Sequence, residues 1–333
     1  MQLITDRAEV LARLRQAGEQ GRPLLCPNAE TPDEMEGILL GAQQHARATG
    51  AARATLGMGF TASYPGHSQL GRLVLPGESV AGAAQRWLHW ISGYANRPGL
   101  FDGIEVIPFL DHGWAPHDAD LALMHEAWFQ DALGILMFDA SAFALGENIR
   151  LTAGFVGRAR ARVVIEACPE KVYDQAGLAG KNPLDPGLLS SPEQVERYVR
   201  ATGVDLIVPN LGTEHRALGS SALEYRPELA RDISRRVGPI QALHGTSSLG
   251  GRLGMVGGDG ICKINYYTAM ARAATTAMNE ALSAAPKPLG VAHTCGSFIH
   301  GVRREAVAKN IAATLGLLAG AGCDATGKTT PPN

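Results

Sequence analysis

The sequence lacks long hydrophobic runs and any leader-like segment at its start. No apolar stretch approaches the roughly 20 residues that a membrane-spanning helix requires. The chain begins MQLITDR, without the charged and then apolar order of a secretory signal peptide. These absences argue against a membrane-spanning or secreted protein, so the sequence predicts a cytoplasmic one.

An excess of charge of either sign is also lacking. The chain has 30 Lys and Arg residues against 32 Asp and Glu residues, for a formal net charge of -2. A protein with this balance has no overall field that attracts nucleic acid or an anionic membrane surface. We therefore expect neither as a partner, and an anionic small molecule must be held by a local site.

Cysteines are few and irregularly placed. The five of them, at 26, 168, 262, 295 and 323, are spread along 333 residues. An odd number of widely spaced cysteines in a long chain is unlike a disulfide framework. Reduced thiols are therefore expected.

Glycine and proline, at 40 and 19 residues, also stay below the roughly 25–30% of the chain that signals low complexity.

What the sequence does contain is a regular alternation of short apolar runs and amphipathic stretches. Eight apolar runs resemble strands buried on both faces of a parallel sheet. They are residues 23–27, 54–60, 104–110, 134–139, 162–167, 205–209, 240–244 and 260–264. Eight strands alternating with helices predict an α/β protein with a (β/α)8 (TIM) barrel, and an open doubly wound sheet is the alternative. A dinucleotide-binding fold is disfavoured because no Gly-x-Gly-x-x-Gly turn follows the first strand.

Helix starts and the extent of the domain follow from local signals. A proline preceded by a capping residue and followed by an acidic residue, as at Pro32 and Pro192, predicts a helix start. We expect residues 1–333 to form a single domain, with the barrel over about 20–285 and a C-terminal helical extension over about 297–322. The Gly- and Pro-rich stretch 173–192 is a candidate for a mobile active-site loop.

Polar side chains follow several of the predicted strands where each strand ends. Asp111 and His112 follow the third strand, His215 follows the sixth, and His244 ends the seventh. The carboxyl ends of barrel strands meet at one rim, and neutral imidazoles suit Zn²⁺, with three ligands leaving a position open for catalysis. One histidine beside an apolar strand is more often packed than a ligand. Their coincidence across three strands favours a metal site.

The motifs at these strand ends resemble those of the class II, zinc-dependent ketose-bisphosphate aldolases, of which this chain looks like a divergent member. The motifs are FLDHG (109–113), MFDAS (137–141) with GENI (146–149), ATGVD (201–205) with GTEH (212–215), LHGTSS (243–248) and GICKINYYT (260–268). The likeness is collinear from about residue 23 to residue 273. It implies a (β/α)8 barrel that acts on a sugar or sugar-phosphate-like substrate, usually as a homodimer or a higher homo-oligomer such as a tetramer.

The resemblance also implies roles for particular residues. His112, His215 and His244 would bind one Zn²⁺ per chain, and Asp111 would be the catalytic acid/base. Such an aldolase, a lyase, forms or cleaves a carbon–carbon bond through a zinc-stabilised enediolate while a carboxylate moves a proton. Two alternatives stay open: a metal-dependent sugar epimerase or isomerase on the same barrel, and a non-catalytic aldolase-like partner subunit.

Departures from the family pattern concern the metal site and the fourth strand. Glu166 stands where the family begins a Glu-x-Glu motif, and Cys168 replaces the second Glu. Cys168 is either a packed thiol or, like Glu166, a further or alternate metal ligand. Asp139 either orients metal or substrate or caps the end of its strand. Lys263 is interpreted as an ion-pair partner and not as a Schiff-base nucleophile.

The substrate-binding residues that the resemblance implies lie at the same rim. They are Gly245, Ser247, Asn265, Thr268, Arg216 and Asp139. Backbone N–H and hydroxyl groups of the first four can form an anion nest. Arg216 replaces a glycine and either pairs with Glu214 or offers its guanidinium to a carboxylate or phosphate. Tyr267 replaces an aspartate, and Leu25 an asparagine, so we expect a substrate other than the central glycolytic one.

Overall fold

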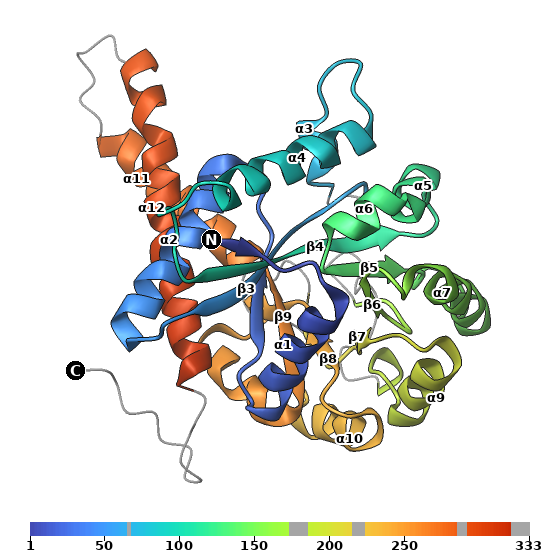
Figure 1. The fold of residues 1–333 in the computed structure, drawn as a ribbon. Helices are drawn as coiled ribbons and strands as arrows, with labels where there is room; N and C mark the ends of the chain where they lie inside the picture. The colour runs from blue at the N-terminus through green and yellow to red at the C-terminus, as the bar shows by residue number, and fades with distance from the viewer. Residues whose placement is uncertain (65–67, 173–185, 215–223, 285–291, 321–333) are drawn as a thin grey trace.

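Eight parallel strands form a closed ring in the computed structural model, which describes residues 1–64, 68–172, 186–214, 224–284 and 292–320 (Figure 1). In order around the ring they are β2 (Leu24–Pro27), β3 (Ala54–Thr61), β4 (Ile104–Trp114), β5 (Ile135–Asp139), β6 (Val164–Ala167), β7 (Leu206–Ile207), β8 (Gln241–Leu243) and β9 (Ile261–Tyr266). β9 pairs with β2, and a bridge from Asn28 to Gly59 joins β2 to β3. The predicted (β/α)8 barrel is confirmed.

Each of the eight predicted strands corresponds to one strand of the ring. One strand was not predicted: β1 (Gln2–Leu3) pairs with Glu105 and Val106 at the start of β4. It leads into α1 (Arg7–Glu19), whose Val10 and Leu14 pack against apolar side chains at the amino ends of the strands, including Ile135. α1 therefore covers the amino end of the barrel.

The remaining described helices surround the ring. They are α2 (Pro32–Thr49), α3 (Leu70–Leu73), α4 (Val80–Ala95), α5 (Asp118–His125), α6 (Ala127–Ala132), α7 (Leu145–Ala159), α9 (Pro192–Thr202), α10 (Pro227–Val237), α11 (Thr268–Ala284) and α12 (Ala292–Ala319), with 3₁₀ turns η1 (Pro186–Leu188), η2 (Thr246–Ser248) and η3 (Gly250–Asp259). α2 and α9 begin at Pro32 and Pro192, as the capping signals predict. The Ser191 side chain accepts a hydrogen bond from the Gln194 N–H, which satisfies one of the unpaired donors of the helix start.

The C-terminal helical arm is also confirmed, although α12 begins at residue 292 and not at 297. It lies along α2 (Figure 1). Glycines on α2 permit this close approach, because a Cβ at Gly41 would lie 2.5 Å from the Ala308 carbonyl oxygen. Part of the predicted mobile loop, residues 173–185, is outside the described residues, and the rest forms η1 and the start of α9.

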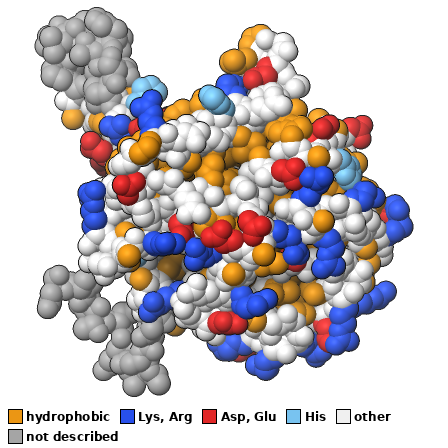
Figure 2. Space-filling view, in the orientation of Figure 1, with side chains coloured by type: hydrophobic (Ala, Val, Ile, Leu, Met, Phe, Trp, Pro, Cys, Tyr) orange, Lys and Arg blue, Asp and Glu red, His pale blue; other side chains and the backbone are white. Residues whose placement is uncertain are grey.

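Three further properties of the described part bear on the expectations from composition. Acidic and basic side chains are interspersed over the face shown in Figure 2. Within the described ranges, every helix is too short or too polar to cross a membrane. Cys26, Cys168 and Cys262 are buried free thiols.

Candidate metal and catalytic site

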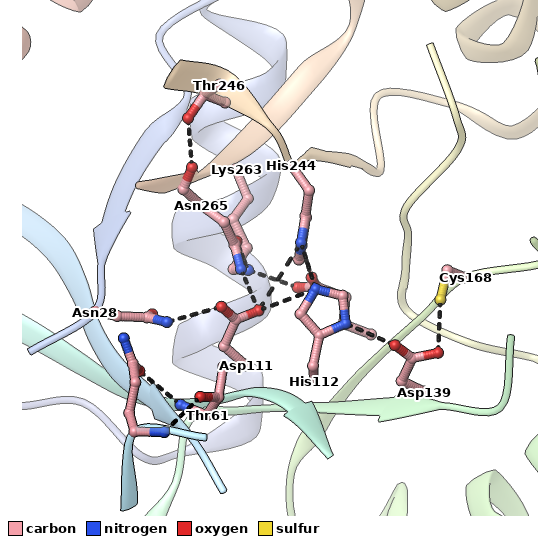
Figure 3. A network of polar contacts seen from close by, with 12 residues as sticks. Asn28, Thr61, Asp111, His112, Asp139, Cys168, His244, Thr246, Lys263 and Asn265 are labelled. Atoms are coloured by element: carbon pink, nitrogen blue, oxygen red, sulfur yellow. Dashed lines mark hydrogen bonds and ion pairs between the residues drawn. The ribbon is translucent and has the colours of Figure 1, made fainter. Parts of the chain in front are cut away.

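Polar side chains from five strands of the ring converge at its carboxyl end (Figure 3). They come from the ends of β4, β5 and β6, from the residue after β8, and from β9. The residues are Asp111, His112, Asp139, Glu166, His244, Lys263 and Asn265, and each is buried. Because the carboxyl ends of barrel strands meet at one rim, the fold brings together residues that are up to 154 positions apart in the chain.

Asp111 and His112 both face this site although they are neighbours on one strand. Successive side chains on a regular strand point to opposite faces. Here His112 has a φ of 48°, in the left-handed region, and the register of β4 against β5 shifts between Leu110 and Gly113. This local irregularity places Asp111 Oδ1 only 3.9 Å from His112 Nε2. Backbone strain of this kind persists where surrounding contacts hold it, commonly at functional sites.

His112 and His244 each have one ring nitrogen, here called the outer one, beside a carboxylate, and the other, the inner one, facing the other ring. His112 Nδ1 lies 2.6 Å from Asp139 Oδ2, and His244 Nε2 lies 3.0 Å from Glu166 Oε1. The inner nitrogens, His112 Nε2 and His244 Nδ1, face each other at 3.2 Å. Asp111 Oδ1 is 3.9 Å from His244 Nδ1 as well. The ligand atoms of Asp111, His112 and His244 all lie within 4.8 Å of one another.

The carboxylates of the site are ionised at neutral pH. Burial raises the pKa of Asp139, but the hydrogen bond with His112 lowers it to about 2 overall. Burial likewise raises the pKa of Glu166 and of Asp111. The Lys263 ammonium lowers that of Glu166, the neighbouring histidines lower that of Asp111, and both end below their ordinary values. Ionised carboxylates only accept hydrogen bonds, so each imidazole donates from its outer nitrogen.

This arrangement fits a divalent metal ion. An imidazole that donates from one nitrogen presents a lone pair on the other. Two such lone pairs 3.2 Å apart repel each other unless a proton or a metal ion lies between them. Carboxylate partners on the outer nitrogens are the usual support of metal-binding histidines. The inner nitrogens of His112 and His244 therefore form a donor set suited to a borderline cation such as Zn²⁺, with the Asp111 carboxylate beside them.

A cavity of about 100 Å³ opens beside this donor set. Four of the predicted substrate-binding residues line it together with Asp111, His112 and His244. These four are Gly245, Ser247, Asn265 and Thr268. Asp139 does not line the cavity and instead holds His112 from behind. His215 and Arg216 lie outside the described residues, so their predicted roles stay predictions.

Glu166, Cys168 and Lys263 make contacts that bear on the alternatives left open by the sequence. Glu166 contacts His244 with one oxygen and Lys263 Nζ with the other, at 2.8 Å. The Cys168 thiol donates to Asp139 Oδ1 at 3.2 Å, and burial raises the pKa of this thiol well above its usual value. The contact favours the packed thiol over a ligand. Lys263 is an ion-pair partner in the structure.

Three further residues of the site were not among the predicted ones. Asn28 donates to Asp111 Oδ2 at 2.8 Å, and its place directly after the first ring strand was a usable signal. Tyr64 stacks on His112 with ring centroids 4.3 Å apart. Arg72 lines the cavity mouth and pairs with Glu30. Tyr64 and Arg72 come from the segment after β3, which carries no sequence pattern for such contacts.

Comparison with known proteins places the chain in a family. The model of the family described as fructose-bisphosphate aldolase class-II matches residues 74–322. This chain belongs to the class II fructose-bisphosphate aldolase family. The match spans the residues of the site just described, apart from Asn28, Tyr64 and Arg72.

Individual relatives agree with this assignment. Protein YdjI of Escherichia coli K12 is 31% identical over 182 residues, which span 53% of this chain and 62% of that protein. The fructose-bisphosphate aldolase of Helicobacter pylori strain J99 is 30% identical over 153 residues, which span 44% of this chain and 46% of that protein. These matches cover less than two thirds of the relatives' own lengths.

Solved structures show the same fold along nearly the whole chain. The YdjI aldolase of E. coli K12 superposes with a TM-score of 0.67 at 20% identity, covering 97% of this chain and 99% of that one. Fructose-bisphosphate aldolase of Campylobacter jejuni superposes with a TM-score of 0.73 at 16% identity, covering 96% of each chain. At these identities the likeness concerns the fold alone.

Proposed function

We propose that this chain is a metal-dependent aldolase that forms or cleaves a carbon–carbon bond of a ketose or ketose-phosphate-like substrate. The observation that carries the proposal is the cavity at the carboxyl end of the barrel. There the Asp111 carboxylate lies 3.9 Å from each of two imidazole nitrogens that face each other. The family membership and the aldolase-named relatives support the same reaction class.

His112, His244 and, from the resemblance, His215 would hold the metal ion, which we propose is Zn²⁺, one per chain. Imidazole nitrogen is a preferred zinc ligand. A bound divalent cation supplies Lewis acidity toward a carbonyl oxygen. The chain's own contribution is to set the tautomers: Asp139 accepts the Nδ1 proton of His112 and Glu166 the Nε2 proton of His244, so that the inner nitrogens would be the ones to hold the ion.

Asp111 is the proposed acid/base. Its oxygens accept hydrogen bonds from Asn28 at 2.8 Å and from Asn265 at 2.7 Å, and the carboxylate lines the cavity. Its lowered pKa keeps the carboxylate ionised, the form that can accept a proton from a substrate hydroxyl and return it in the reverse direction. The two amides fix the carboxylate so that proton transfer needs no rearrangement of Asp111.

Substrate would bind among the groups of the carboxyl rim. Gly245 has a φ of 65°, and a Cβ there would lie 2.8 Å from the Glu214 backbone, so this turn depends on glycine. Ser247, Thr268 and the Asn265 side chain line the same cavity. We propose that this set, with Arg216, binds a sugar or a sugar phosphate, and that Asp139 acts on substrate only through His112.

Assembly and location are proposed from the same resemblance. We propose one domain over residues 1–333 that assembles as a homo-oligomer, a dimer or tetramer, in the cytoplasm. Buried free thiols at positions 26, 168 and 262 are typical of a reducing compartment. Light scattering coupled to size-exclusion chromatography measures the assembly directly.

Chelation followed by product analysis tests the reaction class. Removal of metal is expected to abolish turnover, and borohydride with substrate is expected to trap no lysine adduct. Two carbonyl fragments as products support aldol cleavage, whereas a single isomer of equal mass supports the epimerase or isomerase alternative. A metal-loaded chain that turns over no ketose donor would favour the non-catalytic partner subunit.

A further inference from the structure

Lys263 lies on β9, two residues before Asn265, and is buried, with 1% of its side chain exposed. Its Nζ is 2.8 Å from Glu166 Oε2, donates to Asn265 Oδ1, and sits 4.8 Å from the centre of the Phe109 ring. A buried ammonium is costly unless it is paired and hydrogen-bonded, and these three contacts meet that requirement. Two of the three partners contact groups of the proposed site: Glu166 contacts His244, and Asn265 contacts Asp111, as Figure 3 shows for Asn265.

The first path runs through Glu166 to His244. Glu166 holds Lys263 with Oε2 and His244 Nε2 with Oε1, at 3.0 Å. A carboxylate paired with an ammonium accepts hydrogen bonds and does not donate them. His244 therefore donates from Nε2 and presents Nδ1 to His112 Nε2, 3.2 Å away. Through Glu166, Lys263 thus fixes the orientation of the His244 ring that suits a metal ion.

The second path runs through Asn265 to Asp111. A side-chain amide offers an oxygen at one end and an NH₂ group at the other, and Lys263 can only donate. Asn265 must therefore turn its Oδ1 toward Lys263, which leaves its Nδ2 to donate to Asp111 Oδ1 at 2.7 Å. Without the ammonium, the oxygen end of the amide would lose this donor, and of the two contacts only the one to Asp111 would still hold the Asn265 side chain in place.

From these two paths we infer that Lys263 is a positioning residue for both halves of the site, orienting His244 through Glu166 and Asp111 through Asn265. The catalytic half of this inference rests on the proposed aldolase function, and the metal-binding half does not. The same contacts exclude a nucleophilic role, because a protonated amine has no lone pair to attack a carbonyl.

Lys263→Met tests the inference, with Lys309→Met as the matched control at an exposed position on α12. The holoenzyme is assayed with a competing chelator for metal affinity and at saturating metal for kcat and KM. For Lys263→Met we expect the Kd for Zn²⁺ to rise about 10- to 100-fold. We also expect kcat to fall about 10- to 100-fold with little change in KM, and Lys309→Met to match the wild type. A purely structural lysine would lower the melting temperature and leave both constants of the folded protein unchanged.

Double variants identify the two paths. If Lys263 acts through its neighbours, Glu166→Gln adds little to the loss of metal affinity in Lys263→Met, and Asn265→Ala adds little to the loss of kcat. Fully multiplicative effects would overturn the inference.

Should Lys263→Met fail to fold, the pair Glu166→Gln/Lys263→Met leaves no unpaired buried charge. This pair is expected to match Glu166→Gln in metal affinity and to fall about tenfold below it in kcat, because Asn265 has lost its partner. Equal kcat values would overturn the inference. A wild-type chain without aldol activity would instead overturn the proposed function, and the metal affinities would still test the Glu166 path.

Discussion

The thiol of Cys168 lies 3.2 Å from Oδ1 of Asp139, the carboxylate whose other oxygen holds His112. By the resemblance, Cys168 stands where the family has a glutamate, and this contact favours one of the two uses considered for the residue, a packed thiol. Directed at Asp139, the protonated thiol supports the histidine from behind. A thiolate ligand would instead require the sulfur to lose its proton, which burial opposes.

Replacement of Cys168 is therefore expected to leave the metal in place. Cys168→Ser and Cys168→Ala should each bind one metal ion per chain, and the cobalt-substituted wild type should show no thiolate-to-cobalt charge-transfer band. Cys168→Ala removes a donor from a buried carboxylate and should cost about 1–2 kcal/mol of unfolding free energy, whereas Cys168→Ser retains a donor. A charge-transfer band that disappears in Cys168→Ser would show that the sulfur is a ligand.

Asp111→Ala separates proton transfer from metal binding. The histidines should retain the metal, and kcat should fall about 10²- to 10⁴-fold because the acid/base is gone. Metal content by mass spectrometry and kcat at saturating metal measure the two effects. Asp118→Ala, at an exposed position on α5, should change neither. Comparable turnover by Asp111→Ala and the wild type would remove Asp111 from the mechanism.

A pH-dependent contribution to stability is expected from Glu170. Burial raises the pKa of this carboxyl from 4.5 to about 7, and Ser190 donates a hydrogen bond to it. The folded state then binds a proton that the unfolded state releases near pH 4.5. Glu170 thus stabilises the fold fully below that pH, and the contribution is lost as pH rises through about 7. The loss is about 3 kcal/mol.

Denaturant unfolding at several pH values between 4.5 and 8 measures this effect. Glu170→Gln, which stays neutral, should flatten the profile. Glu193→Gln, at an exposed position in the first turn of α9, should leave the wild-type slope. A steep profile retained in Glu170→Gln would assign the pH dependence to other groups.

The amino end of the barrel depends on Glu105. This side chain is 4% exposed and accepts from Arg13 at 3.0 Å, Arg53 at 2.9 Å and Thr55 at 2.7 Å. Glu105→Gln should lower the unfolding free energy by about 2–4 kcal/mol, because a neutral amide replaces the buried carboxylate that accepts from all three groups. Glu9→Gln is the control, since Glu9 pairs with the same Arg13 at 3.3 Å on the surface and should cost less than about 0.5 kcal/mol. Equal losses of unfolding free energy in Glu105→Gln and Glu9→Gln would show that burial does not determine the strength of these ion pairs.

The fold was predictable because its strands are nearly continuous apolar runs and its helix starts carry capping signals. Pro32 and Pro192 begin α2 and α9 for local chemical reasons. β1 was not predictable, since a two-residue strand depends on its neighbour β4 and not on its own sequence. The docking of α12 on α2 likewise depends on a close approach at Gly37 and Gly41 that only the packed structure reveals.

The site was predictable as far as strand ends determine it. Asp111, His112 and His244 meet because parallel strands deliver their last residues to one rim. The stacking of Tyr64 on His112 could not be predicted, because the conformation after β3 depends on tertiary contacts. The contact that Asp139 makes could not be predicted either. Its strand end suggested a choice between orienting and capping, and the structure places it outside the cavity, where it supports His112.

The central claim is that His112 and His244 bind one divalent cation at the carboxyl end of the barrel. Crystals of the zinc-loaded protein, measured at the zinc absorption edge, test it most directly. The account predicts one anomalous peak per chain, about 2.0–2.1 Å from His112 Nε2 and from His244 Nδ1. A peak at any other position, or imidazoles bridged by a proton alone in fully zinc-loaded protein, would contradict it.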